Sequence, residues 1–407
     1  MNLKELYGEN CNESFQRNRI EKLKAIFKQN ESCKPEKIFS SSGRAEILGN
    51  HTDHNHGLVM VAAISCDILA AVKKTDDRKI KICSENYAPI LIDLNDTAKK
   101  ENESGTSAAL TRGIAEAIKS RGFIIGGFTA YLTSDIFKGA GVSSSAAYEV
   151  LIAEILNNLY LDEKLSSVDK AVISQYAENV YFGKPCGLLD QSGIAIGSLS
   201  MLDFNVPDNP IIKKLNPPKN YTLVITNTGG DHAALTPHYA AIRSEMEEVA
   251  AFFGKKVLRD VPYTEFFDNI AALKEKFSGR AILRAMHFYN ENKRVLAAET
   301  ALEQNNTAAF LNAVNGSGIS SLTLLQNCYV PGDTAQPVVL GIELSRNIIK
   351  DGAVRVHGGG FAGSILACVC NGEIENYAEQ MKKWFGAENV FTANIRKLGT
   401  AFVENCR

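Results

Sequence analysis

The chain has 407 residues, more than one typical domain holds, so we expect two lobes. Its composition, with 45% hydrophobic and 22% charged residues, is ordinary for a soluble protein with full-sized cores. A net charge of −2 argues against a nucleic-acid-binding surface, and no apolar run is long enough to span a bilayer.

The first quarter of the chain combines regular elements with one unusually polar segment. The amphipathic pattern of residues 12–29 predicts a helix with Asn12 as its N-cap, and a strand over 37–42 with a turn at Gly43 follows. The next segment, 43–57, is too polar for a core element. It is either a recognition loop for a hydroxyl-rich ligand or a solvated loop. Beyond it we expect, in chain order, strands at 58–64, 66–74 and 78–84, a helix at 105–121 and a strand at 127–133.

A glycine- and serine-rich stretch, 139–147, leads into a predicted helix that ends near Tyr160. Glycines let several backbone N–H groups point the same way, and a helix start adds unpaired N–H groups and the positive end of its dipole. Together these features predict an anion cradle, most often for phosphate. The serine hydroxyls suit capping, phosphate binding or Mg²⁺ binding, and the alternative for this stretch alone is a plain turn and N-cap.

A further polar segment follows a helix predicted at about 166–181. Gly-Lys-Pro at 183–185 ends that helix, and Gly187 permits a tight turn before Asp190. Asp190 has apolar neighbours, among which a carboxylate must be satisfied or functional, and capping the next turn is the equal alternative. Four prolines between 205 and 219 place the boundary between lobes of residues 1–208 and 209–407.

The second half mixes strands with long helices. We expect a strand from Tyr221, a helix from about Thr236 that carries Tyr239, helical structure over 263–322 and 334–349, a glycine-rich segment at 352–363, a strand at 364–369, a last helix at 373–385 and a short strand near 390–396.

The histidines and cysteines predict neither a metal centre nor a disulfide framework. His51, His54 and His56 fit no standard zinc pattern. The nine cysteines are scattered and odd in number, as in reduced proteins of the cytosol. Because the first residues lack the apolar segment of a signal peptide, we expect a cytoplasmic protein.

Four of these segments, in this order and at this spacing, resemble the motifs of the GHMP small-molecule kinases, and of the galactokinases most closely among them. Residues 43–57 resemble the galactokinase signature, 139–147 the phosphate loop, 186–191 the catalytic-aspartate segment and 358–363 the C-terminal glycine motif. The resemblance runs from about residue 36 to 398, nearly the whole chain.

This resemblance implies an α+β fold of two lobes with the active site in the cleft between them. The N-terminal lobe would be ribosomal-S5-domain-2-like and the C-terminal lobe ferredoxin-like. The family also implies ATP and Mg²⁺, and phosphoryl transfer to the anomeric hydroxyl of galactose. We expect a monomer that takes a small-molecule sugar, without nucleic acid or membrane as a partner.

The resemblance also assigns roles residue by residue. Asp190 would accept the proton of the C1 hydroxyl, and Arg44 would lie against that hydroxyl and the transferring phosphoryl group. Ser145 and Glu178 match the positions of Mg²⁺ ligands. The matching sugar-contacting positions are Asn50, His51, Asp53, Gly187 and Tyr239. The matching phosphate-holding positions are Gly139, Ala140, Gly141, Val142, Ser143, Ser144 and Ser145.

The sequence departs from the family pattern close to the implied sugar site. Asn50 stands where galactokinases have Glu, at the position that meets the C6 hydroxyl, while His54 replaces Tyr, His56 replaces Gly and Ala362 replaces Gly. Losing a carboxylate at position 50 removes a charge-assisted acceptor and also removes repulsion against a C6 carboxylate. Galactose is therefore the first expected substrate, and a uronate, an N-acetylhexosamine or a pentose is the alternative.

A non-catalytic sugar sensor is the alternative from a different functional class. Sensors of this family typically lose part of the serine loop or of the catalytic pair. Arg44, the serine run at 143–145 and Asp190 are all present here, so the sequence favours an enzyme.

Overall fold

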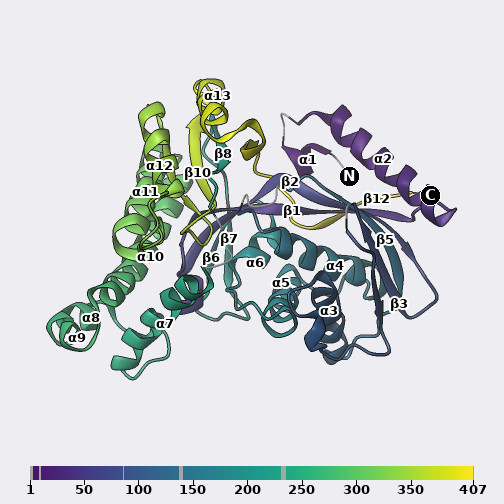
Figure 1. Ribbon diagram of the computed structural model, residues 1–407, viewed down its shortest axis with the longest axis horizontal. Helices are drawn as coiled ribbons and strands as arrows, with labels where there is room; N and C mark the ends of the chain where they lie inside the picture. The colour runs from purple at the N-terminus through teal and green to yellow at the C-terminus, as the bar shows by residue number, and fades with distance from the viewer. Residues whose placement is uncertain (1–2, 9–10, 86, 137–140, 231–234, 407) are drawn as a thin grey trace.

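The computed structural model describes residues 3–8, 11–85, 87–136, 141–230 and 235–406, which form two lobes (Figure 1). Within these ranges the paired strands make an eight-stranded sheet and a four-stranded sheet. The helices of the same ranges include none that combines the length and the apolar character needed to cross a bilayer.

The first lobe is built on the eight-stranded sheet. Its strands are β1 (Lys37–Leu48), β2 (Leu58–Lys74), β3 (Lys79–Ser84), β4 (Ile90–Asp93), β5 (Phe128–Ser134), β6 (Leu199–Asp203), β7 (Ile211–Leu215) and β12 (Ala401–Asn405). Their order is β12-β1-β2-β5-β3-β4, with β6 paired to β2 and β7 to β6. The long central strand β2 is apolar and buried almost throughout, because helices cover both faces of the sheet (Figure 1).

The helices at the start of the chain lie on one face of this sheet, and a later group of helices lies on the other (Figure 1). The first pair is α1 (Leu3–Tyr7) and α2 (Glu13–Glu31); the second group is α3 (Ser107–Ser120), α4 (Ser144–Tyr160), α5 (Ser167–Tyr176) and α6 (Leu189–Ile196). The predicted N-cap of α2 is confirmed, since the Asn12 side chain accepts a hydrogen bond from the backbone N–H of Phe15 at 3.0 Å. The buried apolar faces of α3 to α6 form one continuous core with the sheet.

The second lobe packs helices against the four-stranded antiparallel sheet. The strand order is β11 (Val390–Ala393), β8 (Tyr221–Asn227), β10 (Ser364–Cys370) and β9 (Gly352–His357). The helices are α7 (Thr236–Phe252), α8 (Tyr263–Asp268), α9 (Ile270–Lys276), α10 (Gly279–Glu303), α11 (Thr307–Ser320), α12 (Pro337–Ile348) and α13 (Ile374–Phe385). Short 3₁₀ or π segments complete the described elements: η1 (Asp53–Asn55), η2 (Glu101–Glu103), η3 (Ala177–Phe182), η4 (Leu258–Asp260), η5 (Ser321–Leu325) and η6 (Ala387–Asn389).

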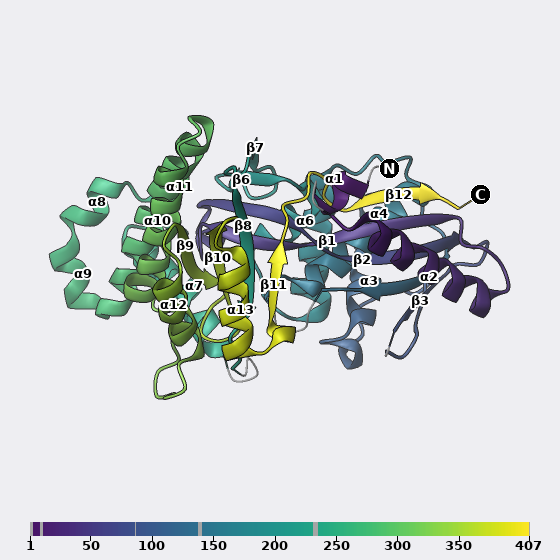
Figure 2. The same ribbon diagram turned by 90° about the horizontal axis from the view of Figure 1, so that it is seen from above.

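The boundary between the lobes differs from the predicted one in two ways. β7 pairs with β6 in the first sheet, so the chain crosses to the second lobe after Leu215 rather than at 208/209. The last strand, β12, returns from the second lobe and pairs antiparallel with β1 at the edge of the first sheet (Figure 2). Residues 211–215 and 401–405 therefore belong to the first lobe, and the sequence reading missed β12 altogether.

The polar segment after Gly43 is not a loop at its start. β1 continues through Gly43 to Leu48 and pairs with β2 along this length, with register shifts at 42/43 and 46/48. The expected turn at Gly43 is therefore wrong, as is the division of β2 into two strands. The physical reason is that the polar side chains of this stretch are buried against partners from distant parts of the chain, which sequence alone does not reveal.

Candidate functional site

An arginine–carboxylate pair lies where β1 meets the start of α6. Arg44 Nε donates to Asp190 Oδ1 at 2.7 Å, and Nη2 donates to Oδ2 at 2.8 Å. The Arg44 side chain is 5% exposed, whereas that of Asp190 is 35% exposed. The guanidinium thus holds the carboxylate from behind in a bidentate grip and leaves it open to a ligand.

The surroundings of Asp190 keep it ionised. Burial alone would raise its pKa, but the charge and hydrogen bonds of Arg44 outweigh burial. The Ser143 hydroxyl, which donates to Oδ2, and the charge of Lys184 act in the same direction, so the pKa of Asp190 lies below its usual value. At neutral pH the side chain is a carboxylate and can accept a proton.

The described part of the glycine-serine loop sits directly beside this pair. Arg44 donates through Nη1 to the carbonyl oxygen of Gly141 and through its backbone N–H to that of Val142, at 3.1 Å in the second case. Gly141 and Ser143 have φ of +67° and +61°, which turns the chain into α4. Ser143 precedes α4, but its hydroxyl goes to Asp190 rather than capping the helix. The predicted phosphate-holding residues Gly139 and Ala140 lie outside the described residues.

The turn before α4 exposes a suitable anion site. α4 is 17 residues long, and its first backbone N–H groups have no partner within the helix. With the positive end of the helix dipole, they favour an anion at this end. The pair Arg44–Asp190 therefore stands at the mouth of a cradle whose chemistry suits phosphate.

The two predicted metal ligands, Ser145 and Glu178, contact each other. Ser145 Oγ donates to Glu178 Oε1 at 3.3 Å, and Lys184 Nζ donates to the same oxygen at 3.3 Å. Gln191 Nε2 donates to Oε2 at 2.7 Å. Among the described residues no group of three or more His, Cys, Asp or Glu side chains is arranged to hold a metal ion. One hydroxyl and one carboxylate still match the needs of Mg²⁺, which takes few protein ligands and keeps waters and phosphate oxygens.

Asp53 and Gly187 approach each other closely. A Cβ atom built on Gly187 would lie 1.7 Å from Asp53 Oδ2, so a larger residue cannot occupy this position without a shift. The backbone N–H of Leu189 donates to the same oxygen at 3.4 Å. Burial, and after it the charge of Asp190, raise the pKa of Asp53. The structure thus brings the 43–57 segment and the 186–191 segment together, as the resemblance implied.

The C-terminal glycine motif closes the other side of the site. His51 Nε2 donates to the carbonyl oxygen of Gly359 at 3.0 Å, and the Tyr239 hydroxyl donates to that of Gly360 at 3.0 Å. Because burial lowers the pKa of His51 to about 4, its ring is neutral, and Nε2 carries the proton. The ring of Tyr239 also packs edge-on against Phe361, with centroids 5.4 Å apart.

Asn50 is enclosed by protein and has nothing left for a sugar. Its Nδ2 donates to Glu46 Oε1 at 2.7 Å and to the Gly358 carbonyl oxygen at 2.8 Å. Its Oδ1 accepts from Asn327 Nδ2 at 2.7 Å and from Ser321 Oγ at 3.4 Å. The residue is 1% exposed, and these four bonds use the full capacity of its amide. In this structure the Asn50 amide is therefore bonded entirely to protein groups, and its implied contact with the substrate stays a prediction.

Three site residues were missed by the sequence reading. Glu46 lies on β1 two residues after Arg44, and Lys184 and Gln191 hold Glu178. A signal for Glu46 existed: residues two apart on a strand share a face, so a strand through Arg44 would have placed Glu46 beside it. Lys184 and Gln191 carry no comparable signal, because they meet Glu178 only through the fold.

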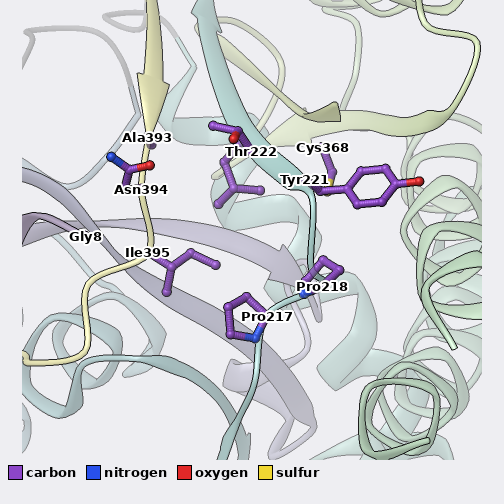
Figure 3. A pocket seen from close by; sticks show the side chains of 10 residues that line it. Gly8, Pro217, Pro218, Tyr221, Thr222, Cys368, Ala393, Asn394 and Ile395 are labelled. Carbon is purple, nitrogen blue, oxygen red and sulfur yellow. The ribbon is translucent and has the colours of Figure 1, made fainter. Parts of the chain in front are cut away.

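A separate small cavity lies where the chain crosses between the lobes (Figure 3). It measures about 150 Å³, and none of the predicted site residues lines it. Pro217, Pro218 and Ile395 form part of its wall, and Tyr221 and Thr222 direct their hydroxyls to Asp351 and Asn371. Its polar side chains are thus engaged elsewhere, so this cavity is not the candidate site.

Comparisons with known proteins show which families the chain resembles. Residues 24–74 match the galactokinase galactose-binding signature, and residues 109–198 match the N-terminal domain of GHMP kinases. A galactokinase of Glaesserella parasuis serovar 5 (strain SH0165) is 33% identical over 391 residues, which cover 91% of this chain and 96% of that protein.

Solved structures show the same fold. The Lactococcus lactis galactokinase complexed with galactose aligns with a TM-score of 0.82 at 24% identity, over 94% of this chain and 99% of that one. The Methanococcus jannaschii mevalonate kinase aligns with a TM-score of 0.63 at 14% identity, over 88% and 98% of the two chains. The two-lobe α+β fold is thereby confirmed.

Proposed function

Because this chain belongs to the galactokinases, within the GHMP kinases, we propose that it transfers the terminal phosphoryl group of ATP to the C1 hydroxyl of galactose. The observation that carries the proposal is the bidentate Arg44–Asp190 pair at the mouth of the α4 anion cradle. It brings a base and a fixed positive charge to a place where an acceptor hydroxyl and a phosphate can meet.

In this proposal Asp190 and Arg44 act on the reacting atoms. The ionised Asp190 accepts the proton of the C1 hydroxyl as that oxygen bonds to phosphorus, and it orients the hydroxyl before transfer. Arg44 stabilises the negative charge that the transferring group carries, while its bidentate grip keeps the base in place. Phosphoryl transfer depends mainly on positioning and charge neutralisation, and this pair supplies both.

The cradle between β5 and α4 holds the phosphates of ATP. Backbone N–H groups of the first turn of α4 favour the anion there, and Gly139 and Ala140, which lie outside the described residues, are proposed to bind it as well. Ser145 and Glu178 would hold Mg²⁺, which neutralises phosphate charge when bound. Lys184, now bonded to Glu178, adds a second positive charge at the edge of this cradle.

The acceptor sugar is held opposite the cradle. Asp53 accepts hydrogen bonds from ring hydroxyls, and the absent side chain of Gly187 leaves room for the carboxylate and the sugar to approach. His51 and Tyr239 border the same space through their bonds to the glycine motif. Asn50 acts indirectly, by fixing the turn that carries His51 and Asp53.

The proposal also includes the protein's state in the cell. We place it in the cytoplasm as a monomer that uses ATP and Mg²⁺, and size-exclusion chromatography with light scattering tests the monomer. The use of ATP is supported by the membership of the chain in the galactokinases.

The decisive experiment measures ADP release from purified protein with Mg-ATP and, in turn, galactose, galacturonate, N-acetylgalactosamine and arabinose. Turnover with galactose that is lost in Asp190→Asn is the expected result. Turnover with another sugar alone overturns galactose as the substrate but keeps the kinase. Binding of sugar and ATP with no turnover on any sugar favours the sensor.

A further inference from the structure

A buried carboxylate, that of Glu46, stands in the site without a part in the mechanism above. Glu46 lies on β1 two residues beyond Arg44, and the two pair with Val61 and Ala63 of β2. Since alternate residues of a strand share a face, both side chains point toward the same space. Arg44 reaches Asp190 from this face, so the Glu46 side chain lies on the same face of β1 as the catalytic pair of the proposed reaction.

The Glu46 carboxylate is fixed from one side. Asn50 Nδ2 and Arg355 Nη2 both donate to the same oxygen, Oε1, at 2.7 and 3.1 Å. The Arg355 side chain is fully enclosed, whereas 6% of the Glu46 side chain stays exposed. Arg355 also donates to the Ile47 carbonyl oxygen, on the strand itself. Arg355 therefore pairs with one oxygen of the carboxylate and ties it to the strand.

We propose that Glu46 is a specificity-determining residue that makes the acceptor site select neutral sugars and reject anionic ones such as uronates. The inference rests on the proposed sugar-kinase function. With Asp53 and Asp190, Glu46 gives the site a third fixed carboxylate. Hydroxyl groups of a sugar donate hydrogen bonds to such acceptors. A carboxylate on the sugar is instead repelled by the carboxylates of the protein, at short range and low dielectric.

The pair formed by Glu46 and Asn50 also changes the meaning of the substitution at position 50. Taken alone, Asn50 removes a negative charge from the turn and so admits a uronate. In the structure its amide donates to the carboxyl group of Glu46 at 2.7 Å, so the site keeps a carboxyl group, on the strand instead of the turn. The substrate class is thus a neutral sugar.

The test compares kcat/KM for galactose and for galacturonate in the wild type and in Glu46→Gln. The wild type should prefer galactose, and the variant should lower the galactose-to-galacturonate ratio by about tenfold, mainly by improving galacturonate, as expected for loss of one like-charge contact. The matched control is Glu154→Gln, which removes another buried carboxylate, paired with Lys170 at 2.5 Å on α4, outside the site. The control should leave the ratio unchanged.

A second measurement needs no variant. Burial raises the pKa of Glu46 to about 7 against the opposing charges of Arg355 and Arg44, and Asp190 adds to the rise. His357 faces the backbone of Glu46 through its Nε2. Galacturonate stays ionised, so the wild-type preference for galactose should grow between about pH 6 and about pH 8.5 as Glu46 becomes charged.

The outcomes separate this inference from the function on which it rests. Galactose turnover with a ratio that Glu46→Gln leaves unchanged overturns the role of Glu46 and keeps the galactokinase. If that variant does not fold, a wild-type ratio that stays flat with pH overturns it instead. A wild type that prefers galacturonate overturns the role of Glu46 and galactose as the substrate but keeps the sugar kinase. A wild type that phosphorylates none of the four sugars overturns the proposed function itself.

Discussion

Arg44 holds both carboxylate oxygens of Asp190, with Nε 2.7 Å from Oδ1 and Nη2 2.8 Å from Oδ2. This contact joins the first strand of the sheet to a helix almost 150 positions later in the chain. It fixes the orientation of the carboxylate, and it lowers the pKa of the base that the proposed reaction needs.

Replacing the base should stop turnover while sparing binding. We expect Asp190→Asn to lower kcat by about 10² to 10⁴, because an amide cannot accept the hydroxyl proton. The KM for galactose should stay within a few fold, since the amide keeps the shape of the side chain. Steady-state ADP release measures both constants. Asp203→Asn, an Asp paired with Arg259 away from the site, should leave kcat unchanged. Equal losses in the two variants would argue against Asp190 as the base.

Weakening the contact between Arg44 and Asp190 should shift the pH profile of kcat/KM. Arg44→Lys replaces a bidentate grip with a single flexible contact, so less is left to oppose the effect of burial on the pKa of Asp190. The pKa should rise, and the acidic limb of the kcat/KM profile should move to higher pH. The Arg259→Lys variant serves as the control. A limb that stays in place while kcat falls would assign Arg44 to the phosphoryl group alone.

Adding one methyl group to Gly187 should disturb sugar binding. A Cβ there would lie 1.7 Å from Asp53 Oδ2, so Asp53 must move. We expect Gly187→Ala to raise the KM for galactose at least about tenfold, because displacements of about 1 Å have large effects in such sites. Gly279→Ala is the control, since a Cβ at that helix start meets open space. Unchanged KM in Gly187→Ala would place the sugar elsewhere.

Removing the charge of Glu178 should weaken divalent metal binding. In Glu178→Gln, Mn²⁺ used as a paramagnetic substitute should bind the ATP complex at least about tenfold more weakly, because hard cations favour charged oxygen ligands. Electron paramagnetic resonance measures this affinity independently of turnover. Glu163→Gln, on an exposed loop, is the control. Equal affinities would exclude Glu178 as a metal ligand.

The stability of the fold should decrease as the pH falls below about 6.5. Burial lowers the pKa of His51 to about 4. Between about pH 6.5 and pH 4 the unfolded chain therefore binds a proton at His51 that the folded protein does not bind. The stabilisation is therefore present above about pH 6.5 and is lost as the pH falls toward 4, with a slope of up to about 1.4 kcal/mol per pH unit for each such group. His54 and His287 act in the same direction, because burial lowers their pKa as well. Urea unfolding at several pH values measures the slope of the unfolding free energy against pH. In His51→Asn this slope should be smaller by the equivalent of about one proton, and an unchanged slope would contradict the role of His51.

The fold class and much of the site follow from the sequence because they depend on local patterns. The N-cap at Asn12, the helix after the serine run and the segment ending at Asp190 each carry their own signals. The family resemblance then implied that these segments come together in one site.

What the sequence could not provide are the partners of buried polar groups. Arg44 and Glu46 look too polar for a strand until Asp190 and Arg355 are seen to neutralise them. Asn50 likewise appears open to a ligand until its four hydrogen bonds are counted. Polar residues satisfied across long sequence separations are the ones a local pattern assigns wrongly to a loop.

The return of β12 to the first sheet has a consequence for how the protein is made. The N-terminal part of β1, from Lys37 to Ser40, pairs on its outer side with residues 401–405. On the ribosome, this stretch therefore keeps an unpaired edge through the synthesis of the whole second lobe, open to pairing with other nascent chains. The first sheet to begin forming is completed last, by the arrival of the chain's final strand.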